Sequence, residues 1–383
     1  WLLSLLVCAA RKSAQETAVF TAQWVARGMR VTALKLGSLF DGIGVFPLAA
    51  MHCGMEPVWA SEIEARPISI TKRHFPDMLH LGDITKISGA EIPPVDVITF
   101  GSPCQDLSQI GTRNGFAGKK SSLFYQAMRI IEEMRYATNG RYPAFTVWEN
   151  VAGAFSSNDR LDFAAMLSAF TGAEVSVPPR GWAHAGMVRG GCADTAWRLL
   201  DAQYWGEPAL AQRRKRVFVV ADFAGQRAGE VLFKPRTVLP FSTISGPGGL
   251  SATQRGGVPA AQTGRQVPIV RPFSLRRMRT MAQVGDQKGF CASFGRGGEP
   301  FPTLLASVTA PFSFWYEGEE QDGFLRVLTP LECERLMGLP ENWTKYGCKN
   351  EEISDHARYR ALGNSIALPC AEYVMAGIAE VMN

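Results

Sequence analysis

The sequence lacks the cysteine pairs, the long apolar runs and the low-complexity tracts that define several protein classes. Its eight cysteines lie at positions 8, 53, 104, 192, 291, 333, 348 and 370, and no two of them form a C-x-x-C pair. Scattered cysteines in a chain of 383 residues do not make a disulfide framework, and their spacing does not resemble a zinc site. We expect no metal and a reducing, cytoplasmic compartment.

The amino-terminal apolar stretch "WLLSLLVCAA" is also too short to cross a bilayer, which needs about 20 residues. Arg11 and Lys12 follow this stretch, whereas a signal peptide carries its positive charges before the apolar run. The chain starts without Met. We therefore expect residues 1–28 to be an upstream or non-native extension, with the working protein beginning near Met29.

Positive charge is in small excess overall, and much of that excess lies in one segment. The formal net charge is +5, and a composition with 46% hydrophobic and 20% charged residues is typical of globular proteins. Residues 211–280 contain thirteen Lys or Arg against only Asp222 and Glu230. A basic segment of this kind indicates a surface that faces a polyanion, although a solvated Arg-rich loop would look the same.

Apolar segments bounded by turn residues predict strands at 33–40, 56–65, 95–100, 144–151 and 216–223. Helical patterns at 122–135 and 194–203 are the clearest of those between them. Strands that alternate with helices predict an α/β domain with a mostly parallel sheet. Ligands bind at the carboxyl ends of such strands, which is where "DGIG", "EIE", "PCQ" and "ENV" fall.

From about residue 224 to 323 the pattern changes. The stretch 241–268 is rich in Gly and Pro and has no clear period, and the whole segment is too long for a structureless connection. We read it as a loop-rich second domain. Regular structure resumes at 328–340, where Thr329 and Glu332 form a capping box, and the apolar tail predicts a helix that packs back on the first domain.

Several side chains at predicted strand ends suit chemistry. Cys104 follows Pro103 at the end of one apolar strand, and Glu149 ends another. Taken alone, such a cysteine is more often a small buried hydrophobe, and such an acid is often a structural cap. In "QRRKRVFVV" the residues alternate, so Arg214 and Arg216 share one face with Gln212, and only one of the two basic sets can point at the site.

The segment "SLFDGIG" places Gly42 and Gly44 in a tight turn between a strand and a helix. This geometry is typical of nucleotide-like cofactor sites but is a weak signal by itself. Glu62 ends the next strand and is placed to bind a ribose hydroxyl pair. Asp83 in "LGDIT" is a further acid that suits an adenine amino group.

These motifs together resemble the DNA (cytosine-5)-methyltransferase family, of the bacterial or phage type. The resemblance rests on "SLFDGIG", "SEIE", "GDIT", "GSPCQDLS", "SSLFYQ", "WENV", "QRRKR", "RVLTPLECERLMGLP" and "ALGNSIALP", in that order over about 36–372. It implies a class I S-adenosylmethionine-dependent methyltransferase fold, α/β with a doubly wound mixed sheet, and a smaller loop-rich target-recognition domain. The expected division is 29–224 catalytic, 225–325 target recognition, and 326–383 a motif region whose last helix returns to the catalytic domain.

The resemblance also implies a reaction. A thiolate adds to cytosine carbon 6, carbon 5 then attacks the cofactor's methyl group, and loss of the carbon 5 proton with elimination of the thiol restores the ring. By matching, Cys104 is the nucleophile and Glu149 binds ring nitrogen 3 and the exocyclic amine. Arg214 is matched to the arginine that holds the carbonyl oxygen, with Arg216 as a supporting neighbour.

The binding residues implied by the same matching form two sets. The residues matched to S-adenosylmethionine are Phe40, Asp41, Gly42, Gly44, Glu62, Ile63, Asp83, Ile84, Pro103, Leu123, Asn364 and Ser365. Those matched to DNA are Gln105, Ser108, Gln212, Arg276, Arg277, Thr303 and Leu304, and the segment 105–120 fits a loop that closes over a flipped base. Three features depart from the family pattern. Asp41 replaces the commoner Ala or Gly and puts a negative charge near a cationic sulfonium, Val45 replaces a glycine, and "ALAQRRKR" lacks the Gly-x-Pro often found before Gln212.

Double-stranded DNA is the expected partner, with a monomer sufficient and a cognate restriction endonuclease acting separately. An RNA-directed enzyme, such as the family's tRNA-modifying relatives, would use the same chemistry. A non-catalytic DNA-binding relative would lack the nucleophile or the glycines that are present here. Amino-methyltransferases are disfavoured because their Asn/Asp-Pro-Pro aromatic motif is absent.

Deleting residues 1–28 is expected to leave folding and methyl transfer intact, because every motif lies beyond Met29. Thermal melting followed by circular dichroism and incorporation of labelled methyl groups would compare the two chains. A large loss of either property would contradict the proposed extension.

Overall fold

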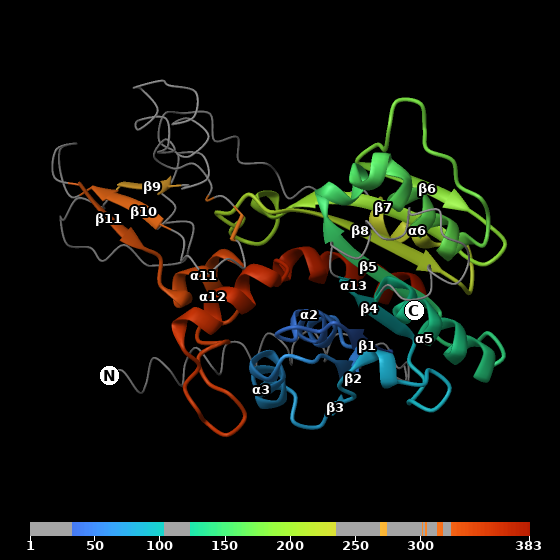
Figure 1. The fold of residues 1–383 in the computed structure, drawn as a ribbon, viewed down its shortest axis with the longest axis horizontal. Helices are drawn as coiled ribbons and strands as arrows, with labels where there is room; N and C mark the ends of the chain where they lie inside the picture. The colour runs from blue at the N-terminus through green and yellow to red at the C-terminus, as the bar shows by residue number, and fades with distance from the viewer. Residues whose placement is uncertain are drawn as a thin grey trace.

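The computed structural model describes residues 33–102, 123–234, 269–273, 301, 303–304, 312–316 and 323–383. An eight-stranded mixed sheet forms its centre, in the order β3-β2-β1-β4-β5-β8-β7-β6 (Figure 1). Its strands are β1 Lys35–Leu39, β2 Glu56–Ser61, β3 Leu79–His80, β4 Val97–Phe100, β5 Phe145–Val151, β6 Ala185–Arg189, β7 Asp194–Asp201 and β8 Lys215–Asp222. The strands from β3 to β5 are parallel, and β8, β7 and β6 continue the sheet in antiparallel pairs.

Helices cover both faces of this sheet, as expected for a doubly wound fold. The helices α2 Val45–His52, α7 Ala228–Leu232 and α13 Leu368–Met382 share one core with the first face, while α5 Leu123–Ala137 and α6 Leu161–Thr171 share another with the second. Successive residues of β5 divide between the two cores, with Val147 in the first and Trp148 in the second. Strands buried on both faces read as continuous apolar runs, which is why they were recognisable in the sequence.

The strands predicted at 33–40, 56–65, 95–100, 144–151 and 216–223 are confirmed as β1, β2, β4, β5 and β8, and the helix at 122–135 is confirmed as α5. The helix predicted at 194–203 is wrong, because Asp194–Asp201 is β7, paired with β8 and β6. Both faces of β7 are largely covered: Trp197 lies in one core and Leu200 in the other. A strand without polar alternation cannot be separated from a buried helix by its period.

The carboxyl-terminal segment adds α11 Pro330–Leu336 and α12 Asp355–Asn364, besides α3 Ala65–His74 near the amino end. The capping box of α11 is confirmed: the Glu332 amide donates to the Thr329 hydroxyl, and the Thr329 amide donates to the Glu332 carboxylate. Helix α13 packs against α2 and α7. In the described part of the chain, no helix taken singly has the length and hydropathy of a bilayer span; α12 and α13, bent by 42°, reach them only as a pair.

A second sheet of three antiparallel strands lies at one end of the molecule, away from the large sheet (Figure 1). It consists of β9 Ile269–Phe273, β10 Phe312–Tyr316 and β11 Gly323–Val327. These strands fall almost wholly within the predicted recognition domain. The helix α7, which follows β8, packs with β7, β8 and α13.

A buried ion pair holds the loop after α11. The Glu334 carboxylate, fully buried, pairs with Arg358 at 3.1 Å and accepts the amides of Asn342 and Thr344. This loop carries Trp343, whose indole N–H donates to the Ile43 carbonyl at 2.8 Å. The carboxyl-terminal segment thereby supports the glycine-rich turn after β1.

Replacing Glu334 with Ala is expected to cost about 3–5 kcal/mol of unfolding free energy, because the buried Arg358 would lose its buried carboxylate and keep only the longer pair with the exposed Asp355. Urea denaturation would measure this loss. The matched control is Glu341→Ala, which removes an exposed ion pair with Arg335 and should cost about 0–1 kcal/mol. Equal small losses for both variants would show that the buried pair does not hold the loop.

Candidate active site

A cavity of about 700 Å³ opens at the carboxyl ends of β1, β2, β4 and β5. This volume lies in the range of cofactor-sized pockets. Ten residues matched to the cofactor line it: Phe40, Asp41, Gly42, Glu62, Ile63, Asp83, Ile84, Leu123, Asn364 and Ser365. Gly44 does not line it, and Pro103 lies outside the described residues.

The turn after β1 passes through left-handed backbone conformations, which favour glycine. Phe40, Gly42 and Gly44 all have positive φ, of 54°, 60° and 78°. A Cβ at Gly44 would also meet Phe75 at 3.1 Å. The glycines therefore allow the chain to turn sharply between β1 and α2 and to leave the cavity floor open.

The carboxylate of Glu62 is fixed by backbone amides. One oxygen accepts from Gly42 at 2.9 Å, and the other accepts from Ile63 at 2.7 Å and Glu64 at 3.0 Å. Asp83 caps a short 3-10 helix, Ile84–Lys86, and the amide and hydroxyl of Thr85 hold the pKa of that carboxyl below its usual range. Glu62 and Asp83, which follow the neighbouring strands β2 and β3, thus both line the cavity wall with their carboxylates held in place.

Glu149 and Arg216 form an ion pair at the same cavity. The guanidinium Nε lies 3.0 Å from the carboxylate Oε1, and both side chains are nearly buried. Burial raises the pKa of Glu149, and the positive charges of Arg216 and Arg214 oppose that rise. Burial thus makes this carboxyl easier to protonate than an exposed one, although it remains paired with Arg216.

The end of β4 is held by β5 beside this pair. The Trp148 indole donates to the Ser102 hydroxyl at 3.0 Å, and the Asn150 amide donates to the Ser102 carbonyl at 3.2 Å. Ser102 stands two residues before Cys104. Cys104 itself lies outside the described residues, so its role stays a prediction.

The expectation that Arg214 faces the substrate is not met by its geometry. Its side chain is 1% exposed and does not line the cavity. Its guanidinium donates to the carbonyls of Leu304, Gly363 and Ser365, which occupy both terminal nitrogens. Arg214 is therefore a clamp between three chain segments, and Arg216 is the arginine that reaches the cavity.

The recognition residues that are described lie against this clamp. A parallel bridge joins Gln212 to Phe301, and the Thr303 hydroxyl donates to the Arg213 carbonyl at 2.6 Å. The prediction that Gln212 contacts DNA is not met, because its side chain is fully buried. Leu304 lines the cavity, while Gln105, Ser108, Arg276 and Arg277 lie outside the described residues.

Some residues at the site were missed in the sequence. Arg360 lines the cavity and pairs with Glu64 at 2.6 Å, and Trp343 supports the glycine-rich turn from below. Nothing in the sequence linked these pairs, which are about 300 residues apart. Asn150 carried a signal, since it follows Glu149 in the "WENV" motif.

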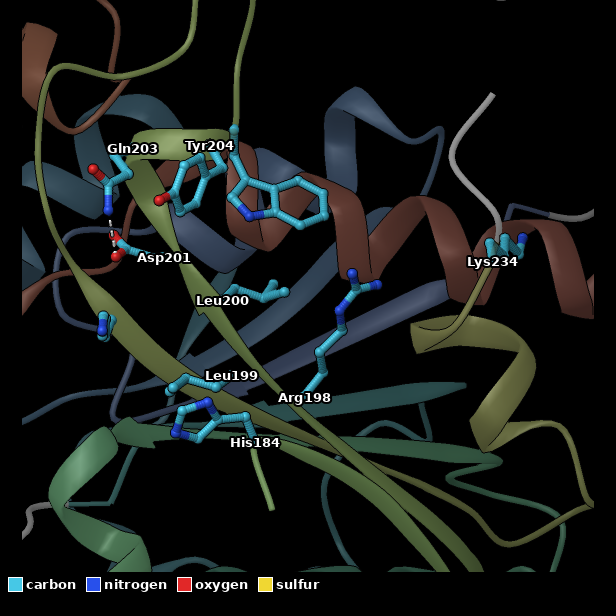
Figure 2. Close-up of a pocket in the computed structure, with 10 residues that line it drawn as sticks. His184, Arg198, Leu199, Leu200, Asp201, Gln203, Tyr204 and Lys234 are labelled. Atoms are coloured by element: carbon cyan, nitrogen blue, oxygen red, sulfur yellow. Dashed lines mark hydrogen bonds between the residues drawn. The ribbon is translucent and has the colours of Figure 1, made fainter. Parts of the chain in front are cut away.

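Figure 2 shows a second cavity, of about 400 Å³, at the end of β7. None of the residues that line it was predicted as a site residue. Two of its basic side chains already have partners: Lys234 pairs with Glu380, and Arg198 donates to the Leu232 carbonyl and the Tyr373 hydroxyl. Gln203 donates to Asp201 at 2.7 Å within it.

The sheet order and the cavity at its strand ends define a class I, S-adenosylmethionine-dependent methyltransferase fold. The family model of the C-5 cytosine-specific DNA methylases matches residues 34–235 and 273–380. The chain belongs to this family, as its motifs predicted.

Individual relatives have low sequence identity to this chain, but the matched regions cover most of it. The type II methyltransferase M1.ScrFI of Lactococcus lactis subsp. cremoris is 27% identical over 91% of this chain and 78% of its own length. A protein of Escherichia phage P1 named DNA N-6-adenine-methyltransferase is 24% identical over 88% of this chain, which spans 60% of that protein. Among solved structures, the Dnmt2 methyltransferase of S. pombe matches with a TM-score of 0.56 at 16% identity, covering 92% of this chain and all of that one.

Replacing Arg214 with Lys should lower the unfolding free energy by about 2–4 kcal/mol, because buried carbonyls would lose their donors. Arg216→Lys, the matched control, should stay within about 1 kcal/mol because it keeps the charge beside Glu149. Chemical denaturation would compare them. A larger loss for Arg216→Lys than for Arg214→Lys would contradict the structural role given to Arg214.

Proposed function

We propose that this chain transfers a methyl group from S-adenosylmethionine to carbon 5 of a cytosine within a specific sequence of double-stranded DNA. Membership of the C-5 cytosine-specific DNA methylase family supports the reaction. The observation that carries the assignment in this chain is the Glu149–Arg216 pair, which faces a cofactor-sized cavity. A carboxyl and a guanidinium placed together suit the edge of a cytosine ring.

Carbon 5 of cytosine is a poor nucleophile, and the covalent route overcomes this. Addition of the Cys104 thiolate to carbon 6 makes carbon 5 enamine-like. S-adenosylmethionine supplies an electrophilic methyl group on its sulfonium sulfur. Once carbon 5 has taken the methyl group, loss of its proton and elimination of the thiolate restore the aromatic ring. The base must leave the helix first, because these atoms are unreachable within a duplex.

Glu149 and Arg216 would hold the base during these steps. The raised pKa of Glu149 favours a protonated carboxyl that donates to ring nitrogen 3 while accepting from the exocyclic amine. Arg216 would bind the carbonyl oxygen and balance charge that develops on the ring. It takes the role that sequence matching gave to Arg214.

The residues of the cavity fit an adenosyl cofactor. Glu62, fixed by three amides, would accept the ribose hydroxyls, with Ile63 at the exposed rim. Asp83 and Ile84 would meet the adenine edge, and Asn364 and Ser365 would close the other end.

The remaining assignments concern partners and place. Arg214, Arg216, Arg227 and Lys234 are engaged within the described structure. The nine other basic residues of 211–280 support a duplex-binding surface around the recognition segment. Thr303 and Leu304 would set the recognition segment beside the flipped base. We further propose that the enzyme acts in the cytoplasm of a bacterium or of a phage host, as a monomer, with any restriction endonuclease as a separate protein.

Cys104→Ser should abolish methyl transfer, a fall of at least about 10³-fold, while leaving duplex binding largely intact. Labelled-methyl incorporation and a gel-shift assay would measure the two properties. DNA containing 5-fluorocytosine should trap an adduct that survives denaturation, because its carbon 5 carries no removable proton. Retained turnover, or the absence of a trapped adduct, would rule out the covalent route.

The nucleic acid is tested in the same assay. Duplex DNA and tRNA would be offered separately, and bisulfite sequencing of a plasmid expressed with the gene would locate the modified cytosines. Methyl incorporation into tRNA alone would end the DNA assignment while leaving the chemistry in place.

A further inference from the structure

Asp41 is half-buried, and its carboxylate lies at the wall of the cofactor cavity. One of its oxygens, Oδ2, accepts only a long hydrogen bond of 3.4 Å from the Thr71 hydroxyl. That hydroxyl is shared, since it also lies 3.2 Å from the Gly42 carbonyl. The other oxygen, Oδ1, is buried and has no hydrogen-bond partner among the described residues. The fold thus leaves this acid short of partners where a ligand would lie.

The groups around Asp41 do not neutralise it. Ser38 faces it from β1, Thr71 from α3, and the carboxylate of Glu62 from the end of β2. Burial of the carboxyl, with a smaller contribution from Glu62, raises the pKa of Asp41 to about 7, against the opposing influence of the Ser38 and Thr71 hydroxyls. Elsewhere on the described cavity wall, Arg216 pairs with Glu149 and Arg360 with Glu64, and the further charged or titratable residues are Arg66, Asp83 and His356.

We propose that Asp41 makes this cavity select the cationic S-adenosylmethionine over its neutral-sulfur product, S-adenosylhomocysteine. The inference rests on the proposed function. The two molecules differ by one methyl group and one positive charge. A fixed carboxylate in a buried wall attracts that charge strongly, because little water screens it. No such attraction acts on the thioether that remains after methyl transfer.

Selection of this kind helps turnover. Once the methyl group has left, the product loses its attraction to Asp41 and is displaced more readily by fresh cofactor. The selection also depends on pH. Below about pH 7 the carboxyl is largely protonated and the two ligands are treated alike; above it, the carboxylate favours the cation. Binding of the cation near this pH releases a proton.

Isothermal titration of the full chain with each ligand separately would test the inference, at about pH 6 and about pH 8. The ratio of the Kd for S-adenosylhomocysteine to the Kd for S-adenosylmethionine should rise at least about fivefold between the two pH values. In Asp41→Asn the ratio should stay flat. Any pH dependence that comes from ionisation of the ligands themselves would persist in this variant, so the variant controls for it. Asp77→Asn, which removes an exposed acid outside the cavity, is the matched control and should behave as the unchanged chain.

A ratio that does not change with pH in the unchanged chain, or one that rises equally in Asp41→Asn, would overturn the inference. Should Asp41→Asn fail to fold, proton release by the unchanged chain still decides, through titrations in two buffers of different ionisation enthalpy. Release with S-adenosylmethionine but not with S-adenosylhomocysteine supports the proposal, and equal release with both contradicts it. Binding of neither ligand would instead remove the proposed function itself.

Discussion

The antiparallel register between β5 and β8 is the constraint on which the active site depends. In this register Val151 lies opposite Arg216 and Glu149 opposite Phe218, so the guanidinium reaches back along the pair to the carboxylate. A slip of one residue would send Lys215 into the site and turn Arg216 to the other face of the sheet. The parallel half of the sheet adds the cofactor cavity at the same edge, because β1, β2, β4 and β5 all end there.

Distant segments then fix the parts that strands alone cannot hold. The guanidinium of Arg214 donates hydrogen bonds to the carbonyls of Leu304, Gly363 and Ser365. It thereby joins the recognition segment at Leu304 to the end of α12. Burial beside Arg216 lowers the pKa of Arg214 to about 9, and the three carbonyls compensate its charge. Trp343 supports the glycine-rich turn in a similar way. Buried hydrogen bonds thus join the recognition segment and the glycine-rich turn to the carboxyl-terminal segment.

Two acids of the cavity wall, Glu149 and Asp41, differ in their surroundings and therefore suit different partners. Glu149 is matched by Arg216, and burial favours its protonated form for a neutral base. Asp41 has no cationic partner among the described residues, so the cofactor's own charge would be its match. One fold can therefore prepare two carboxyls for different partners through their surroundings alone.

The sequence by itself determined the strands, the order of the motifs and the family, because strands buried on both faces leave long apolar runs and reactive side chains follow them directly. It could not separate β7 from a helix, since a doubly buried strand has no polar alternation. Nor could it decide between Arg214 and Arg216, which share one face of the same strand pattern. Only the tertiary structure decided that, by supplying carbonyls from residues 304, 363 and 365 to one arginine and a carboxylate from β5 to the other.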